Sequence, residues 1–259
     1  MITSNYHTHT YLCRHAQGKP EDYIKRAIEV GYKEIGISDH GPIFSNSLKR
    51  MSLDEFHQIY LKELNEAIEK YQYQITIYKG LEVEYLADHK DYYQYLLNYL
   101  DYLILGQHIV FQNDKVVTVY SGMNEETIYL YAYTVVEALN TKLFRILAHP
   151  DIFMFSYPKW DEHCKKVSRI IIEAAIKNNC LLEINANGAR RGKILNENNE
   201  ERWIYPRLEF WKIVSNEYRN AQVIINDDAH TIKDLHDNAT LGMYKFAKEL
   251  NLNVVDKIF

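Results

Sequence analysis

The stretch Glu-Ile-Gly-Ile-Ser-Asp-His at residues 34–40 holds the pattern that decides the fold. Its first five residues form a short and mostly apolar run, which is typical of a buried strand. Asp39 and His40 follow at once, so two polar side chains stand where the strand ends. The same order, a short strand and then a histidine or an acid, returns several times along the chain.

Short strands alternate with amphipathic helices on both sides of this stretch. We expect further strands at residues 2–9, 74–78, 103–105, 144–148, 181–185 and 222–226. We expect helices at residues 20–30, from residue 52 onward, and at 125–139, 161–177 and 235–250. Pro20 suits a first helical turn, Gly31 suits the position after a helix, and Ser52 forms a capping box with Glu55. This alternation predicts an α/β fold with parallel strands, either open or closed into a barrel.

The composition limits the classes of partner. The 259 residues contain no linker-like run, so we expect a single domain over 1–259. A net charge of −5 gives no basic footprint for nucleic acid. An acidic protein does not attract an anionic substrate, so a phosphate group would need local positive charge, which bound metal ions would supply.

The cysteines and the apolar runs bear on the compartment. Three cysteines, Cys13, Cys164 and Cys180, do not make a disulfide framework, so we expect a reducing, cytoplasmic location. The N-terminus lacks the pattern of a signal peptide. Apolar runs fall short of the roughly 18 residues that span a membrane, so we expect no membrane partner.

Polar side chains recur at the carboxyl ends of the expected strands. They are His7, His9, Asp39, His40, Glu82, His108, His149, Asn185, Asp228 and His230. In barrels built from β/α units this rim carries the active site. Any one of these histidines could be a hydrogen-bonded structural residue. Together they favour a metal site, because so many titratable groups at one rim are costly unless cations neutralise the acids.

The residue types also indicate which metals would bind. His7 and His9 lie two positions apart on an extended segment, so their side chains point the same way and can chelate one ion. Imidazole and carboxylate together suit zinc, iron and manganese. Ligation without a set of cysteines favours a catalytic site over a closed structural one.

The order of these motifs resembles the PHP (polymerase and histidinol phosphatase) family over nearly the whole chain. The shared motifs are supplied here by His7 and His9, His15, Asp39 and His40, Glu82, His108, His149, and Asp228 and His230. The runs at 101–106 (DYLILG) and 183–190 (EINANGAR) are most similar to the stand-alone histidinol-phosphatase type. The resemblance implies a distorted (β/α)7 TIM-like barrel.

The resemblance also implies two or three divalent metal ions, Zn, Mn or Fe. The first would be held by His7, His9, Glu82 and Asp228. Glu82 would bridge to a second, held by His108 and His149, and a third would be held by His15, His40 and His230. Asp39 would orient a ligand. Glu82 stands in the family's Gly-x-Glu position, and we expect Glu84 to face away if the strand continues.

Two departures from the family pattern concern this ligand set. Asp227 stands where many relatives have serine, so a second carboxylate either alters the metal preference or points away. The segment Gly106-Gln107-His108 is tighter than the family form, which affects the expected placement of His108.

The activity that the resemblance implies is metal-dependent hydrolysis of a phosphomonoester, with L-histidinol phosphate as the substrate in histidine biosynthesis. Arg190 or Arg191 could clamp the phosphate, although a solvated basic loop is the alternative. Asp228 or a clustered histidine could protonate the leaving group, and we expect Cys13 to be a bystander thiol. A phosphatase for another small phosphoester and a non-catalytic metal-binding module are the alternative functions. The native metal and the oligomeric state stay open.

Overall fold

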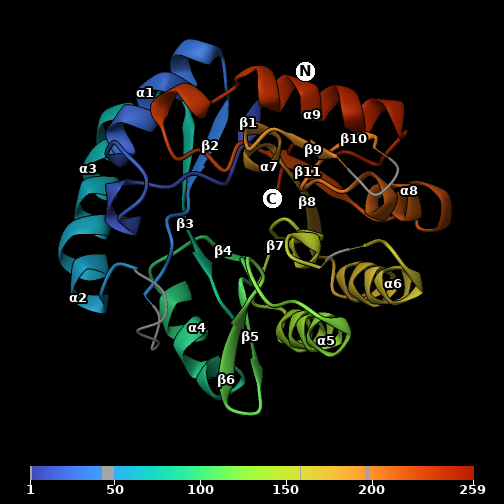
Figure 1. The fold of residues 1–259 in the computed structure, drawn as a ribbon. Coiled ribbons are helices and arrows are strands. Elements are labelled where there is room, and N and C mark those ends of the chain that lie inside the picture. Colours follow the sequence, from blue (N-terminus) through green and yellow to red (C-terminus); the bar gives the residue numbers. More distant parts are fainter. Residues whose placement is uncertain (1, 43–49, 158, 196–198) are drawn as a thin grey trace.

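A computed structural model describes residues 2–42, 50–157, 159–195 and 199–259, and its centre is a barrel of seven parallel strands (Figure 1). The strands follow the order β1 (Ser4–Asn5), β2 (Glu34–Ile37), β3 (Thr76–Val83), β4 (Tyr102–Leu105), β7 (Ile146–Leu147), β8 (Leu181–Asn185) and β11 (Val223–Asn226). Every pair of neighbours is parallel. Just beyond β1 and β11, a parallel bridge between Thr8 and Ala229 nearly closes the barrel.

Helices surround the strands (Figure 1). They are α1 (Pro20–Val30), α2 (Leu53–Glu55), α3 (Leu61–Tyr71), α4 (Lys90–Leu97), α5 (Glu125–Asn140), α6 (Glu162–Lys177), α7 (Ala186–Arg190), α8 (Leu208–Glu217) and α9 (Asn238–Glu249), with a π-helical turn at Phe56–Tyr60. Short 3-10 turns lie at Tyr11–Cys13, Ala87–His89, Ile152–Met154 and Ile232–Asp234. Two antiparallel hairpins extend from the barrel: β5 (Ile109–Gln112) with β6 (Lys115–Thr118), and β9 (Lys193–Leu195) with β10 (Glu201–Trp203).

The expected elements are largely present, and their ends follow the expected chemistry. The helix predicted at 20–30 has those bounds and ends at Gly31, whose φ of 88° suits a residue without a Cβ. Ser52 and Glu55 form the predicted capping box. The first strand is shorter than expected, because residues beyond Asn5 leave the ladder to enter the rim. Strand β3 is longer and carries Glu82 within it.

The interior of the barrel is apolar and is built around Tyr102, a side chain with 2% exposure. Its ring lies against Gly36 and Gly80 on the two preceding strands, where a Cβ atom would overlap the tyrosine side chain. The Tyr102 hydroxyl donates a hydrogen bond of 2.6 Å to the carbonyl of Tyr6. Ile258, near the C-terminus, packs into the same cluster. The two glycines therefore provide the space for the ring that fills the barrel.

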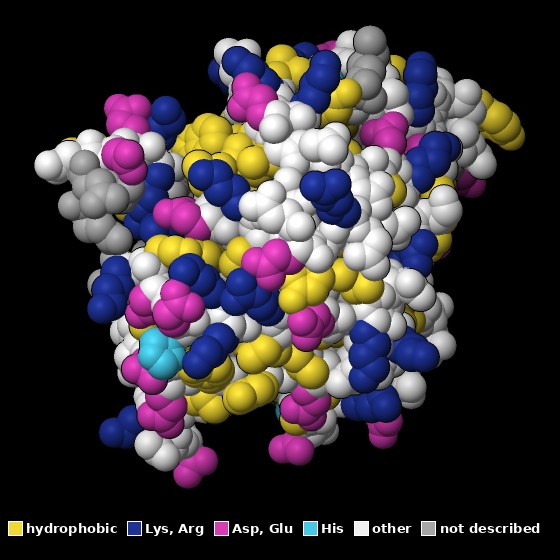
Figure 2. Space-filling model, turned by 90° about the vertical axis from the view of Figure 1, so that its right-hand side faces the viewer, with side chains coloured by type: hydrophobic (Ala, Val, Ile, Leu, Met, Phe, Trp, Pro, Cys, Tyr) yellow, Lys and Arg dark blue, Asp and Glu magenta, His cyan; other side chains and the backbone are white. Residues whose placement is uncertain are grey.

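The outer surface carries charges of both signs. On the face shown in Figure 2, Lys and Arg side chains are interspersed with Asp and Glu and with small apolar patches. Within the described ranges, none of the helices combines the length and the apolar character needed to cross a membrane.

Replacing Gly80 with alanine should destabilise the protein by about 1–3 kcal/mol, the usual cost of overpacking a core. The reason is the overlap between the new Cβ and the Tyr102 ring. Urea unfolding of both proteins measures this difference in free energy.

Gly242→Ala is the matched control, because a Cβ at that helical position meets no atom within 4 Å. We expect this control to be neutral or stabilising. In a Tyr102→Leu background the cost of Gly80→Ala should shrink. An equal cost in both backgrounds would show that the ring is not the cause.

Candidate metal centre

The polar side chains expected at the strand ends converge on one cavity at the carboxyl end of the barrel. Its volume is about 260 Å³. It is lined by His9, His15, His40, Glu82, His108, Tyr120, His149, Asn187, Arg191, Tyr205, Asp228 and His230. The residues come from segments spread over the chain, and the parallel strands bring their ends to the same rim.

One group of ligand atoms lies on the side of the rim where the barrel closes. His7 and His9 follow β1, and their Nε2 atoms are 3.1 Å apart. The Nε2 atom of His9 lies 3.0 Å from Oδ1 of Asp228, which follows β11. Both histidines face Oε2 of Glu82, at 3.5 and 3.6 Å. The expectation that His7 and His9 point the same way is therefore confirmed.

The other carboxylate oxygen of Glu82 faces a second group. His149 Nε2 lies 3.2 Å from Glu82 Oε1, and His108 Nε2 lies 3.7 Å from the same oxygen. His108 thus reaches the centre despite the tight turn at Gly106. These three residues offer ligand atoms within 4.8 Å of one another.

A third group, His15, His40 and His230, lies beside the first two. Its ring nitrogens also lie within 4.8 Å of one another. His40 is close to Glu82 as well, with its Nδ1 atom 2.8 Å from Oε2. The family resemblance implies the same three groups, and their role as metal ligands stays a prediction.

The chemistry of this cluster fits divalent cations. Two facing imidazole nitrogens cannot both be lone-pair acceptors without a proton or a cation between them. Oδ1 of Asp228 is buried without a hydrogen-bond partner in the described structure. Although burial opposes ionisation, His40 and His7 hold the pKa of Glu82 well below its ordinary value. Buried and ionised acids among imidazoles form the donor set that zinc, manganese and iron prefer.

Glu84 does not face away, and that expectation is wrong. Glu84 lies one residue beyond the end of β3 at Val83, and its carboxylate contacts the same histidine, His108, that Glu82 faces. Its Oε1 is 2.7 Å from Nδ1 of His108, and its Oε2 accepts a 2.7 Å bond from the His108 backbone N–H. Glu183, an acid in the middle of strand β8, contacts His7 in the same way at 2.8 Å. Sequence reasoning missed Glu183, although an acid inside such a strand was the available signal.

The two aspartates that precede ligand residues behave differently. Oδ1 of Asp39 lies 3.6 Å from Nδ1 of His9, where it can orient that ring. Asp227 points away from the cavity: its carboxylate accepts a 2.8 Å bond from the Tyr32 hydroxyl and is also bonded to Thr240. Of the two alternatives for Asp227, the structure favours the side chain that leaves the metal groups alone.

The two arginines are separated by the local fold. The Arg190 guanidinium donates to Asp237 Oδ2 at 2.8 Å and to the carbonyls of Asp227 and Asp234 at 2.5 and 2.6 Å. Its donors are thereby used in holding α7 to the start of α9. Arg191 lines the cavity. Of the two arginines that could clamp a phosphate, Arg190 is therefore excluded and Arg191 is the one in position to do so.

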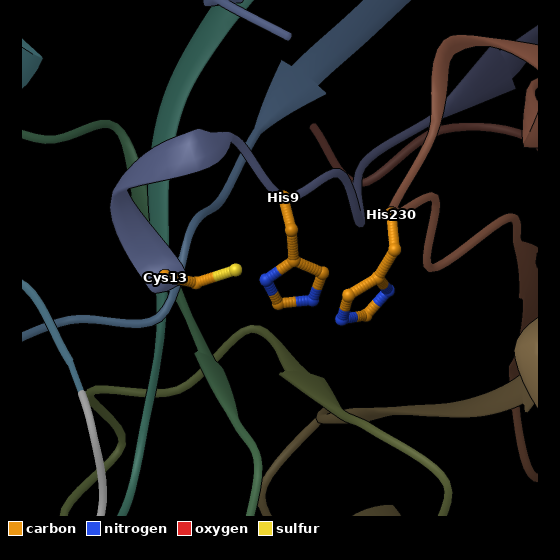
Figure 3. A group of neighbouring side chains, drawn as sticks. All are labelled: His9, Cys13 and His230. Atoms are coloured by element: carbon orange, nitrogen blue, oxygen red, sulfur yellow. The ribbon is translucent and has the colours of Figure 1, made fainter. Parts of the chain in front are cut away.

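Cys13 directs its sulfur toward the ring of His9, and His230 lies on the other side of that ring (Figure 3). Ligand atoms of the three residues lie within 4.8 Å of one another. Burial raises the pKa of the Cys13 thiol to about 12. The assignment of Cys13 as a bystander stays a prediction.

Aromatic and amide side chains complete the rim and were missed by sequence reasoning. Tyr120, from the end of the β5–β6 hairpin, places its ring 5.9 Å from that of His108 at an angle of 15°. Tyr205 and Asn187 also line the cavity. The two tyrosines lie outside helices and strands, and Asn187 lies in the short helix α7, so none of the three follows a long periodic pattern.

Comparisons with known proteins agree with this geometry. The model of the family described as PHP domain matches residues 5–187. A Deinococcus radiodurans protein named "Probable histidinol-phosphatase" is 26% identical over 155 residues, which are 56% of this chain and 59% of that relative. The chain thus matches less than two thirds of that relative's length. The "Histidinol-phosphatase" of Bacillus subtilis is 21% identical over 88% of this chain and 94% of its own.

The fold is shared with a solved structure, histidinol phosphate phosphatase from Lactococcus lactis. The TM-score is 0.72 at 18% identity, covering 98% of this chain and 95% of that one. The family match spans more than half of the sequence and includes strands β2 to β8 and the rim residues from His7 to Asn185. This chain belongs to the PHP domain family.

Proposed function

We propose that this chain is a metal-dependent phosphomonoesterase that hydrolyses L-histidinol phosphate to L-histidinol and phosphate. The observation that carries the proposal is the Glu82 carboxylate, whose two oxygens face two different groups of histidines. The comparisons support the substrate. Relatives over most of the chain carry the name histidinol-phosphatase, and the Lactococcus structure is a complex with Zn, L-histidinol and phosphate.

We assign two or three divalent ions, Zn, Mn or Fe, to the three groups of ligands. His7, His9, Glu82 and Asp228 would hold the first, and Glu82, His108 and His149 the second. His15, His40 and His230 would hold the third. Such ions supply Lewis acidity and positive charge, which lower the pKa of water and neutralise phosphate oxygens.

The protein's own side chains position the substrate and the ligands. Arg191 offers a guanidinium that can bind two phosphate oxygens at once. Asp39 orients His9. Oδ2 of Asp228 accepts bonds from the Asn185 and Asn187 amides at 3.0 and 3.2 Å, which leaves Oδ1 facing the histidines. Asp228 and the clustered histidines are the candidate donors of a proton to the leaving alkoxide.

Two further assignments stay predictions. We propose that residues 1–259 act as one domain. We also propose a reducing cytoplasmic location, and the three cysteines support it because each is buried with a free thiol.

Replacing His9 with alanine should reduce metal-dependent phosphate release from L-histidinol phosphate by roughly 100-fold or more, since a catalytic metal contributes several kcal/mol. The measurement is phosphate release after chelated protein is reloaded with zinc, manganese or iron.

His57→Ala is the matched control, because His57 is bonded to Tyr95 at 2.6 Å and lies outside the cavity. It should keep its activity. If the wild-type protein releases phosphate from neither L-histidinol phosphate nor a generic aryl phosphate with any of the three metals, the proposed function is contradicted. Release from a generic aryl phosphate alone would contradict only the substrate.

Arg191→Ala and Arg190→Ala should fail in different ways. Loss of a charge-assisted contact to phosphate at Arg191 should lower kcat/KM by about 10–100-fold, with little change in stability. Loss of Arg190 should instead lower the free energy of unfolding by about 1–3 kcal/mol, since its charged hydrogen bonds join α7 to α9. Steady-state kinetics and urea unfolding of both variants check this division. A kinetic defect confined to Arg190→Ala would reverse the assignment.

A further inference from the structure

Glu183 is a carboxylate with no exposed surface, and within the described part of the chain N–H groups surround it. Oε1 receives Nδ1 of His7 and Nδ2 of Asn226, both at 2.8 Å. Oε2 receives Nδ2 of Asn185 at 2.8 Å and the backbone N–H of His149 at 3.2 Å. An ionised carboxylate is acceptor-only and satisfies four such donors, whereas an amide of the same shape would turn N–H groups against two of them.

The partners of Glu183 are themselves fixed in orientation. Oδ1 of Asn226 accepts the backbone N–H of Tyr6 at 2.9 Å, so its amide nitrogen must face Glu183. Oδ1 of Asn185 accepts the backbone N–H of Asn187 at 3.0 Å, and its nitrogen therefore faces the acids. These backbone bonds determine which end of each amide is the donor. The acceptor role of Glu183 is thus imposed from both sides.

Glu183 links the ends of four neighbouring strands. It lies on β8, and its partners His149, Asn226 and His7 follow or end β7, β11 and β1. Nδ2 of Asn185, which donates to Glu183, also donates to Oδ2 of Asp228 at 3.0 Å. One buried acid therefore holds His7 and, through Asn185, Asp228. It does so at the seam where the barrel closes.

Glu84 has the same relation to His108. Both of its oxygens accept N–H groups of that one residue at 2.7 Å, from the ring and from the backbone. Among the described residues, Glu84 also pairs with Arg50, whose guanidinium is another donor and lies 3.7 Å away. The third ligand group is held differently, since Nδ1 of His15 and of His230 face backbone carbonyls at 2.8 and 3.1 Å.

We propose that Glu183 and Glu84 are positioning residues that hold His7 and His108 with Nε2 toward the metal ions of the first and second groups. This inference rests on the proposed function. A carboxylate on Nδ1 fixes the tautomer and the ring orientation and makes Nε2 a better ligand. Neither acid is among the ligands, and each acts through the histidine that it holds. The backbone carbonyls at the third group give a weaker hold of the same kind.

The test compares zinc affinity in Glu183→Gln, Glu84→Gln and the wild type by competition with a chelator of known affinity. Each substitution keeps the volume and removes the acceptor-only character. We expect each variant to bind zinc about 10–100-fold more weakly, the usual effect of removing such a partner. Zinc binding requires no substrate, so it is independent of phosphatase activity.

Glu34→Gln is the matched control. Glu34 is also a buried acid on a barrel strand, but it is bonded to the Tyr6 hydroxyl at 2.5 Å and to Lys257, away from the cavity. Its zinc affinity should match the wild type within about twofold. The urea midpoints of the metal-free proteins separate the two roles, because a purely structural acid would lower the midpoint and leave the zinc affinity unchanged.

The outcomes separate this inference from the proposed function. Unchanged zinc affinity in both variants overturns the positioning role, even where the enzyme is active. Weaker affinity in both variants and not in the control supports it, even where L-histidinol phosphate is not hydrolysed. A wild type that binds no zinc overturns both proposals. If Glu183→Gln does not fold, Glu84→Gln decides, because Glu84 lies outside the seam of the barrel.

Discussion

The structure depends on one charge, the Glu82 carboxylate enclosed by imidazoles at the mouth of the barrel. Its 2% exposure denies it solvation by water, so its burial is tolerable only because partners compensate its charge. The chain makes room for it with Gly106, where a Cβ atom would overlap the Glu82 side chain. The strand order brings histidines from both sides to this acid. The barrel, Gly106 and the ligand groups therefore act together to accommodate the buried charge of Glu82.

The acids around this centre form an inner layer that faces the cavity and an outer layer behind the histidine rings. Glu82 and Asp228 face the cavity, while Asp39, Glu84 and Glu183 lie behind histidine rings. An inner acid needs a cation, whereas an outer acid needs only N–H donors. Asp227 belongs to neither layer, since its bonds to Tyr32 and His236 direct it to the packing between α9 and the barrel. Position relative to a ring, and not residue type, separates these roles.

The alternation of strands and helices, and the polar residues at the strand ends, could be predicted from the sequence because these features obey short-range rules. The closed barrel and the division of the metal ligands were implied by the family resemblance. Apolar runs of strand length ended at histidines, and parallel strands place such ends together. Contacts between distant segments were beyond this reasoning. The contact of Glu183 with His7 joins residues 176 positions apart. The division between Arg190 and Arg191 depends on where a five-residue helix begins, and the error over Glu84 came from misapplying the two-residue period of a strand.

The Tyr102 ring and Ile258 fill the barrel beneath the ligand groups. The cavity is consequently closed at its base. Substrate and products must enter and leave through the rim, where Tyr120 is exposed. For the proposed phosphatase, this geometry sets the order of departure. A phosphate held by the ligand groups would lie at the floor of the cavity, and the alcohol would lie nearer to the mouth and leave first. Inorganic phosphate would then leave last and compete with each new substrate for the same site.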